Sequence, residues 1–321
     1  MTTFHRLRTA PLLGAAFLTA GLARAAAPPP TPQPLPEGVT PFEVASSSPT
    51  SWYGRFGWTN VGWIDMGDGV LLIDTGASAA DAENIKAKIK ETTKGKPIRW
   101  VVLTHPHIDN SGGLPSFLGT DATFFVNLKA AGPTATHLAR DKGSRIPSVI
   151  GVKDRAVIAS GANAVELVAV DGSAHTADDL IAFHRATGIA YVGDLLTPNR
   201  CPMTSDPGAD PRGWNAALDD IALLHPALLV ATRGDATGQV EAELNKTRAY
   251  LKRVTDLLAE FKKQSMPDAR VASELVQRKL GDYCPTPLDN ANILRLYQRA
   301  DASGNLKPAT GAAKPATKKK G

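Results

Sequence analysis

The chain has 321 residues, of which 43% are hydrophobic and 21% are charged, so it can bury a substantial core in one large domain or two small ones. Its formal net charge of +5 is misleading, because three arginines lie within the first 27 residues and five lysines follow Asp301, with no acidic residue in either segment. The remainder carries about −3, which gives no electrostatic basis for nucleic-acid binding.

The N-terminus has the pattern of a secretory signal peptide. Arg6 and Arg8 form a basic region, residues 11–22 are apolar but too few to span a bilayer, and Ala23-Arg24-Ala25 matches a small-residue cleavage signal. We therefore expect residues 1–27 to be removed and the protein to be periplasmic or secreted, with a membrane anchor as the alternative. No later run is long and apolar enough to predict a transmembrane segment.

Composition divides the rest of the chain into four parts. Residues 28–50 are rich in Pro, Ser and Thr and are interpreted as a linker, residues 51–266 as the main domain, and residues 267–302 as a helical annex. The Lys-rich residues 303–321 have little apolar surface to bury and are expected to be disordered. Cys201 and Cys284 could pair in an exported chain, but the sequence does not show whether they come within reach of one another.

The first elements expected in the main domain are a hairpin, a helix and a strand. Strands at 62–66 and 70–76 flank Gly67-Asp68-Gly69, which is a turn signal. Ser78 and Asp81 then form a helix-capping pattern. The helix that follows has apolar residues at 82, 85 and 89, ends before Gly95 and Pro97, and leads to a β-branched strand at 101–104.

The pattern is weaker beyond residue 113 and becomes clear again near residue 155. One strand is expected at 123–126, and His137 is interpreted as an exposed helix or loop histidine. His184 lies inside a strand and is interpreted as a packed or exposed strand residue rather than a ligand. Further strands are expected at 155–158, 165–170, 180–183, 189–196 and 228–230, and amphipathic helices at 214–224 and 240–261.

Two histidines and a carboxylate follow the strand that ends at Thr104. His105, His107 and Asp109 occupy alternate positions, and a Gly pair follows at 112–113. Ligands collect where the carboxyl end of a buried strand opens into a loop, and neutral imidazole is the commonest metal ligand. The pattern therefore predicts a metal site, in which Asp109 is either an oxygen ligand or the acceptor for a metal-bound water.

This segment resembles the His-x-His-x-Asp-His signature of the metallo-β-lactamase superfamily, with Asn110 in place of the last histidine. The resemblance implies a four-layer αβ/βα sandwich, here with a C-terminal helical extension, and zinc in a cleft at one edge of two sheets. Within the superfamily the chain looks loosely similar to exported proteins related to the quinoprotein relay zinc metallohydrolases.

Other segments match the superfamily in the same order along the chain. Ile73-Asp74-Thr75-Gly76 resembles an early loop beneath the metal site, and Gly193-Asp194 resembles the strand end whose carboxylate commonly bridges two metals. His175, followed by Thr176 and Asp179, matches the third histidine. The resemblance thus implies a first zinc on His105, His107 and His175.

The second metal site of the family is incomplete in this chain. Asp109 and Asp194 are kept as candidate ligands, but Asn110 and Arg233 stand where two histidines are usual. We therefore expect one zinc per chain and a second site that is weak or absent. Arg233 could instead pair with the two carboxylates in place of a cation, or hold an anionic substrate group, or point to solvent. Asn110 and Arg233 are also candidates for binding substrate.

Three protein ligands and water form an open, catalytic type of zinc site, so the sequence predicts an exported metallo-hydrolase. A metal-bound hydroxide would attack a carbonyl substrate, which could be a lactam, lactone, ester or thioester, with Asp109 and Arg233 as further catalytic groups. The alternative is a catalytically degenerate binding or accessory protein on the same scaffold, with a protein partner in the periplasm.

Overall fold

The structure is a computed structural model that describes residues 42–48, 50–140, 144–161, 163–198, 200–278 and 287–307. Of residues 42–48 and 287–289 it describes the backbone only. The predicted signal peptide (1–27), Cys284 and residues 308–321 of the predicted tail lie outside the described residues.

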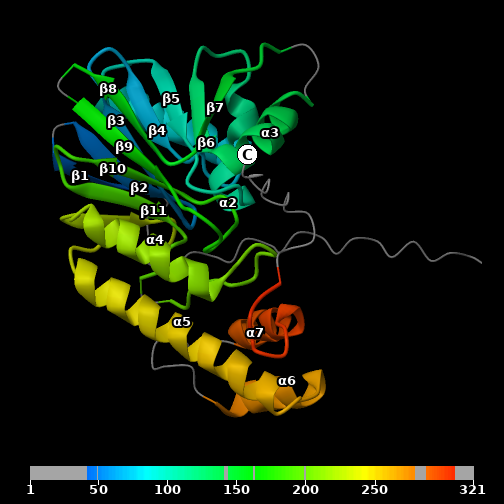
Figure 1. Cartoon of the computed structure of the whole chain (residues 1–321). Coiled ribbons are helices and arrows are strands. Elements are labelled where there is room, and N and C mark those ends of the chain that lie inside the picture. The colour runs from blue at the N-terminus through cyan, green and yellow to red at the C-terminus, as the bar shows by residue number, and fades with distance from the viewer. Residues whose placement is uncertain are drawn as a thin grey trace, which may run out of the picture. The chain divides into compact units, whose positions relative to one another are not determined.

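Two β-sheets form the centre of the fold (Figure 1). The first sheet is antiparallel from its first strand to its fourth and parallel from there on, and its strands lie in chain order: β1 (Phe42–Ser48), β2 (Ser51–Phe56), β3 (Thr59–Asp65), β4 (Val70–Ile73), β5 (Ile98–Val102), β6 (Thr123–Asn127) and β7 (Ser148–Val152). The second sheet is antiparallel except for the pair β12–β11, and its spatial order is β12 (Leu228–Ala231), β11 (Ile189–Gly193), β10 (Leu180–His184), β9 (Asn163–Ala169) and β8 (Arg155–Ser160).

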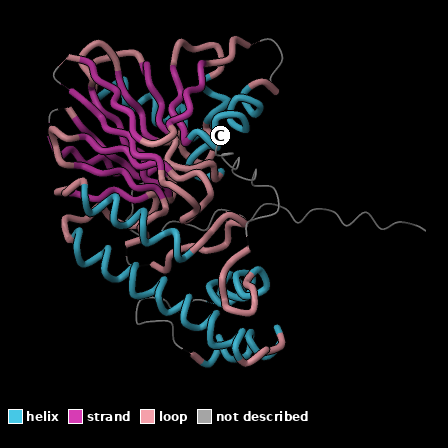
Figure 2. Tube along the Cα trace, viewed as in Figure 1, coloured by secondary structure: helices cyan, strands magenta, loops and turns pink. Residues whose placement is uncertain are grey.

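Helices cover the outer faces of the sheets, so the strands in Figure 2 (magenta) lie between two groups of helices (cyan). The helical segments are α1 (Ala79–Thr92), α2 (Ile108–Ser111), the 3-10 helix η1 (Leu114–Phe117), α3 (Leu128–Leu138), α4 (Pro211–Leu223), α5 (Val240–Lys263), α6 (Asp268–Gln277) and α7 (Pro287–Arg299). Buried apolar residues from α1, η1 and α3 pack on the first sheet, and those from α4, α5, α6 and α7 belong to one apolar cluster with the second sheet. A third apolar cluster lies between the sheets, which completes the predicted four-layer αβ/βα sandwich.

The alternation of side chains along a strand explains how one strand contributes to two layers. In β4, Val70 and Leu72 belong to the cluster beneath α1, whereas Leu71 and Ile73 belong to the cluster between the sheets. Successive side chains of a strand point to opposite faces, so a strand covered on both sides must be apolar throughout. This is why residues 70–73 form a continuous apolar run.

Several predicted elements are confirmed. β3 and β4 form the expected antiparallel hairpin. Ser78 is the N-cap of α1, where its hydroxyl accepts a hydrogen bond from the Asp81 amide, and residues 82, 85 and 89 are buried. His137 is exposed on α3, and His184 is buried in β10, as predicted for residues that are not ligands.

Two of the predicted strands next to the site end earlier in the structure than expected. β5 ends at Val102 because the amide and hydroxyl of Thr104 both donate to Asp74 rather than to a neighbouring strand. β11 ends at Gly193, where φ is +58°, a value that favours glycine and interrupts an extended chain. These early endings release the residues that follow, His105 and Asp194, into loops.

The predicted boundaries also change at both ends. β1 lies within the predicted linker, because residues 42–48 pair with β2. Residues 303–307 of the predicted tail form a turn with a bridge from Leu306 to Ala300. The annex helices α6 and α7 share a core with α5 rather than forming a separate unit. Strands β2 and β7 were absent from the prediction.

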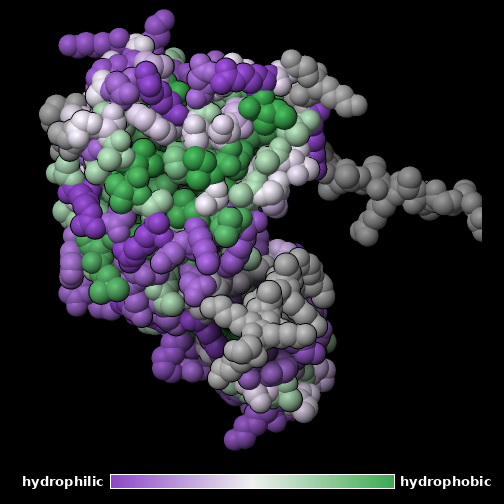
Figure 3. Space-filling view, turned by 45° about the horizontal axis from the view of Figure 1, so that its top comes forward, coloured by the Kyte–Doolittle hydropathy of each residue, from purple (hydrophilic) through white to green (hydrophobic). Residues whose placement is uncertain are grey.

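A few large apolar side chains remain at the surface, and Figure 3 shows hydrophobic surface (green) mainly across the middle of the face in view, with smaller separate areas beside it. Among the described residues, no helix combines the length and the apolar character needed to cross a bilayer.

Candidate metal centre

The predicted site residues converge at one edge of the two sheets. His105 and His107 follow β5, His175 lies in the loop after β9, Asp194 follows β11, and Arg233 follows β12. All of these residues therefore follow the carboxyl ends of their strands. In a sheet covered by helices, this is the usual position of a binding site.

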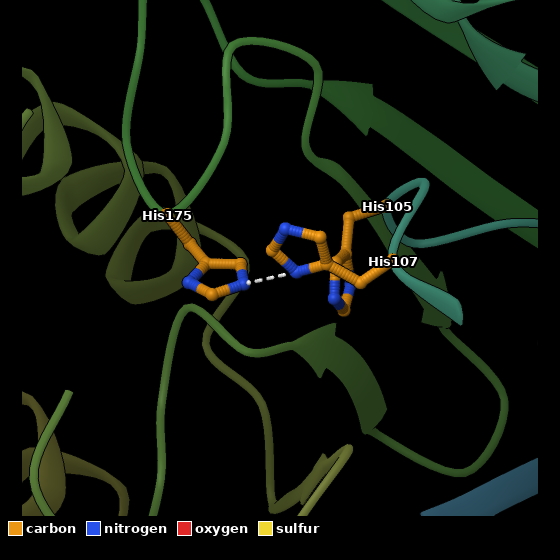
Figure 4. Close-up of side chains that lie close together, drawn as sticks. All are labelled: His105, His107 and His175. Carbon is orange, nitrogen blue, oxygen red and sulfur yellow. Dashed lines mark hydrogen bonds between the residues drawn. The ribbon is translucent and has the colours of Figure 1, made fainter. Parts of the chain in front are cut away.

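The three histidine rings face one common point (Figure 4). Their centroids are 4.8–4.9 Å apart, and their planes are inclined at 84–90° to one another. One candidate ligand atom from each of His105, His107 and His175 lies within 4.8 Å of the other two. His105 and His175 are buried and His107 is partly exposed, so the point they share has access from one side.

The outer contacts of two histidines fix which ring nitrogen carries hydrogen. His107 Nε2 lies 2.8 Å from Asp206 Oδ2, and His175 Nδ1 lies 2.9 Å from the carbonyl oxygen of Met203. A carboxylate and a carbonyl only accept, so both nitrogens must donate. In a neutral ring the other nitrogen then carries a lone pair. Those two nitrogens, His107 Nδ1 and His175 Nε2, lie 3.0 Å apart (Figure 4).

The third histidine is oriented in the same way through a hydroxyl. Thr104 Oγ1 gives its one hydrogen to Asp74 Oδ2, 2.8 Å away, so it accepts from His105 Nδ1 at 3.1 Å. His105 Nε2 is therefore left with a lone pair. It is buried and has no hydrogen-bond partner among the described residues.

Asp194 adds a buried carboxylate to the same point. Its Oδ2 lies 3.6 Å from His175 Nε2 and 3.9 Å from His105 Nε2. Neither oxygen has a hydrogen-bond partner within the part of the chain that the structure describes. When all three rings are neutral, three lone pairs and a carboxylate without a donor face one another in a buried space, an arrangement that a bound metal cation would satisfy.

Arg233 spans two carboxylates beside the histidines. Its Nη2 donates to Asp109 Oδ2, and its Nη1 lies 3.9 Å from Asp194 Oδ2. The arginine side chain is 21% exposed and those of the aspartates are 9% and 1% exposed. Of the alternatives for Arg233, the structure thus shows pairing with the two carboxylates. Asp109, predicted as a ligand, contacts Arg233 and is not part of the three-histidine cluster.

Asn110 belongs to a buried network of hydrogen bonds. Its side chain is fully buried, and its Nδ2 donates to Asp74 Oδ2 at 2.6 Å and lies 3.0 Å from the hydroxyls of Thr104 and Thr232. The amide of Asn110 ties the loop of Asp74 to the loop of Thr232, and its role in substrate binding stays a prediction. Asn110 thus connects loops that carry the site.

Burial sets most of the charge states at the site. It lowers the pKa of His175 to about 3 and holds that of His105 well below its usual value, so both rings are neutral near pH 7. Burial also lowers the pKa of His107, but the hydrogen bond and charge of Asp206 outweigh it and raise the pKa overall. Burial and the charge of Asp194 raise the pKa of Asp109, against the opposing effect of Arg233.

No sequence motif indicates a role for Asp206 or Met203. Both lie in an irregular segment after β11, and only the fold brings them to His107 and His175. Trp214, predicted as a core residue, is buried as expected but also packs edge-on against His175, with ring centroids 5.5 Å apart.

The fold and the site together define an αβ/βα sandwich with three histidines that could hold a metal ion, and sequence comparison identifies its family. A family model described as the metallo-beta-lactamase superfamily matches residues 54–233, more than half of the chain. The chain belongs to this superfamily, whose members typically bind metal ions and are generally hydrolytic. No curated protein matches the sequence significantly.

Solved structures show the same fold at low sequence identity. A metallo-beta-lactamase from Pontibacter korlensis is 22% identical with a TM-score of 0.54, over 66% of this chain and 99% of that chain. A metallo-beta-lactamase from Erythrobacter litoralis is 18% identical with a TM-score of 0.52, over 67% and 97%. The stereoselective inverting sec-alkylsulfatase Pisa1 from Pseudomonas sp. is 16% identical with a TM-score of 0.66, over 80% of this chain and 50% of that chain.

Proposed function

We propose that the protein is an exported zinc-dependent hydrolase that holds one metal ion per chain and acts on a carbonyl substrate such as a lactam, lactone, ester or thioester. The observation that carries this proposal is the set of three inward lone pairs on His105, His107 and His175, each fixed by an outer hydrogen-bond partner. Three nitrogen ligands that leave a further position open are typical of catalytic zinc.

The residues around the histidines suit hydrolysis. Bound there, a zinc ion would supply a Lewis acid and lower the pKa of water to about 7. Asp109, which contacts Arg233 and has a raised pKa, would orient the attacking water and accept its proton. The partly exposed guanidinium of Arg233 offers N–H groups to a developing negative charge on the substrate.

Support for a single metal comes from Arg233 and Asn110. The guanidinium is a permanent cation next to Asp109 and Asp194, the carboxylates that a second metal would need. The side-chain amide of Asn110 donates a hydrogen bond to Asp74 instead. Support for export comes from the signal-peptide pattern and from Cys201, which forms a disulfide, a bond that persists in oxidising compartments. The predicted partner, Cys284, lies outside the described residues.

The same two residues favour a second candidate function. A site in which an arginine and an asparagine have replaced two metal ligands is also what a non-catalytic binding or accessory protein would carry. Both candidates retain the three histidines, so metal binding alone does not separate them.

Zinc content and hydrolysis, measured on the exported protein, test the proposal. Wild type is compared with His107→Ala and with His137→Ala, a matched histidine that is exposed on α3. We expect about one zinc per chain in wild type and His137→Ala and none in His107→Ala, with hydrolysis of chromogenic lactams, esters and thioesters lowered at least ~100-fold in His107→Ala, since a removed ligand takes the metal's chemistry with it. Intact mass shows whether residues 1–27 are removed.

Each outcome has a definite meaning. Wild-type protein that binds no zinc contradicts the metal site itself. Wild-type protein that binds zinc but hydrolyses the panel no faster than His107→Ala supports the accessory role instead.

A further inference from the structure

Residues 200–210, between β11 and α4, form an irregular segment that we call the strap. It contains no helix or strand, yet Cys201, Thr204, Gly208 and Ala209 are buried. The strap supplies the outer hydrogen-bond partners of two of the three histidines, Asp206 for His107 and the Met203 carbonyl for His175. It also contacts the arginine of the site, because Arg233 Nη1 donates to Met203 Sδ.

These contacts decide whether the two histidines present lone pairs inward. An imidazole that donates from one nitrogen offers a lone pair at the other, and a ring without an outer acceptor can adopt either tautomer and rotate. His105 is oriented separately, through Thr104 and Asp74. Two of three ligands therefore depend on one segment that has no ladder of backbone hydrogen bonds to hold it.

Other contacts fix the strap in place. The Gly208 amide donates to Asp206 Oδ1, which sets the direction of the carboxylate. A Cβ on Gly208 would lie 2.8 Å from the Ala177 amide nitrogen, so the strap packs closely on the loop that carries His175. The Asp210 amide donates to the Ala174 carbonyl at 2.9 Å.

Two anchors come from outside the strap and its neighbouring loop. Arg299 of α7 donates to the Ala209 carbonyl at 3.1 Å. Cys201 forms a disulfide at the start of the strap, ahead of both Met203 and Asp206. A covalent bond at this end limits the movement of a segment that regular secondary structure does not restrain.

We infer that the strap is a positioning element for the metal site, in which Asp206 and the Met203 carbonyl fix the tautomers of His107 and His175 and the Cys201 disulfide holds both acceptors in place. This inference rests on the proposed metal site but adds residues outside the ligand set. It assigns the disulfide a role in metal affinity as well as in stability. Asp206 is a positioning residue, since it acts through His107.

Zinc affinity, measured by competition with a chromophoric chelator, tests the strap. Asp206→Ala is compared with Asp171→Ala, which removes an exposed carboxylate from the loop that carries His175. We expect Asp206→Ala to weaken zinc binding about 10- to 100-fold, the usual cost of losing an outer partner of a ligand, and Asp171→Ala to stay within about twofold. The visible spectrum of the cobalt-substituted protein should change in Asp206→Ala only, because the coordination of His107 is altered.

The Cys201→Ser/Cys284→Ser variant tests the covalent anchor and leaves no thiol in the chain to bind zinc itself. We expect zinc affinity about 10-fold or more below that of wild type, within the range for loss of outer support, while far-UV circular dichroism shows that the chain stays folded. When the cysteine changes are combined with Asp206→Ala, the fold loss in zinc affinity should be smaller than the product of the two separate losses, since both changes act through the strap.

Two results would overturn the inference while leaving the proposed function intact. One is a zinc affinity within twofold of wild type in both Asp206→Ala and the cysteine variant. The other is an equal loss in Asp171→Ala, which would show a general charge effect. Failure of wild type to bind zinc would instead remove the proposed function.

Discussion

Arg233 determines the balance of charge next to the three histidines. Asp109 and Asp194 are both nearly buried and lie on either side of one guanidinium. Removing one member of a buried ion pair leaves an uncompensated charge, which typically costs about 3–5 kcal/mol. A buried pair of carboxylates therefore requires a cation, and in this chain the cation is part of the sequence.

Replacing Arg233 should open a second metal position. In Arg233→His, the carboxylates of Asp109 and Asp194 lose their cation and gain an imidazole, a set of ligands that zinc accepts. We expect zinc titration followed by calorimetry to show about one equivalent for wild type and a second, weaker equivalent for the variant. Arg233→Lys keeps the positive charge and should bind only one equivalent of zinc. Two equivalents in wild type would contradict the role assigned to the guanidinium.

At the scale of the elements, β3 packs closely against β11 at Gly62. A Cβ at this position would lie 2.0 Å from Tyr191 Cε1, across the interface of the two sheets. Tyr191 is buried, and its hydroxyl donates to the Trp52 carbonyl at 3.3 Å, so the ring is held at both ends. The spacing of the two sheets at this point depends on Gly62. This spacing bears on the site because β11 leads directly to Asp194.

Gly62→Ala should lower the free energy of unfolding by about 1–3 kcal/mol, the usual cost of overpacking a core. Urea denaturation measures the change. Tyr191→Leu provides the matched partner for a double-mutant cycle, because it removes the ring that the new methyl group would meet. The double variant should lose less stability than the sum of the two single variants, and strict additivity would show that the ring is not the obstacle.

At the scale of the whole molecule, the sequence predicts the layers well and the boundaries less well. The apolar runs and the N-cap of α1 are local signals, and the structure confirms them. The pairing of β1 with β2 joins a Ser-rich segment to the sheet through backbone hydrogen bonds, which composition does not reveal. The sequence does not reveal the strap for a similar reason. Asp206 acquires its role only by lying next to His107, which is 99 residues away in the chain.

The same contrast between local sequence signals and contacts that only the fold creates applies to the site residues. His105, His107 and His175 were identified from motifs, and they meet as predicted. Asn110 stands at a ligand position of the motif, and in the structure its side chain is 0% exposed and its amide donates to Asp74. A motif states which residue types occur at which spacing, whereas the direction of a side chain depends on what surrounds it.

Because the three histidines come from both sheets, a bound metal should stabilise the whole fold. Zinc at about 100 times its dissociation constant contributes about 2.7 kcal/mol, which for a domain of this size corresponds to a rise in Tm of roughly 5–10 °C. Differential scanning calorimetry before and after chelation measures the shift. His175→Ala, which removes the ligand from the second sheet, should show almost none.

The shift should also depend on pH. His107 has a raised pKa in the folded protein, so the stability that its protonated form contributes is present below its unfolded pKa and is lost as pH rises through its folded pKa. Zinc must displace that proton, so metal binding becomes stronger over the same interval. We expect the difference in Tm between zinc-bound and zinc-free protein to be larger at pH 8 than at pH 6. An equal difference at both values would mean that His107 does not exchange a proton for the metal.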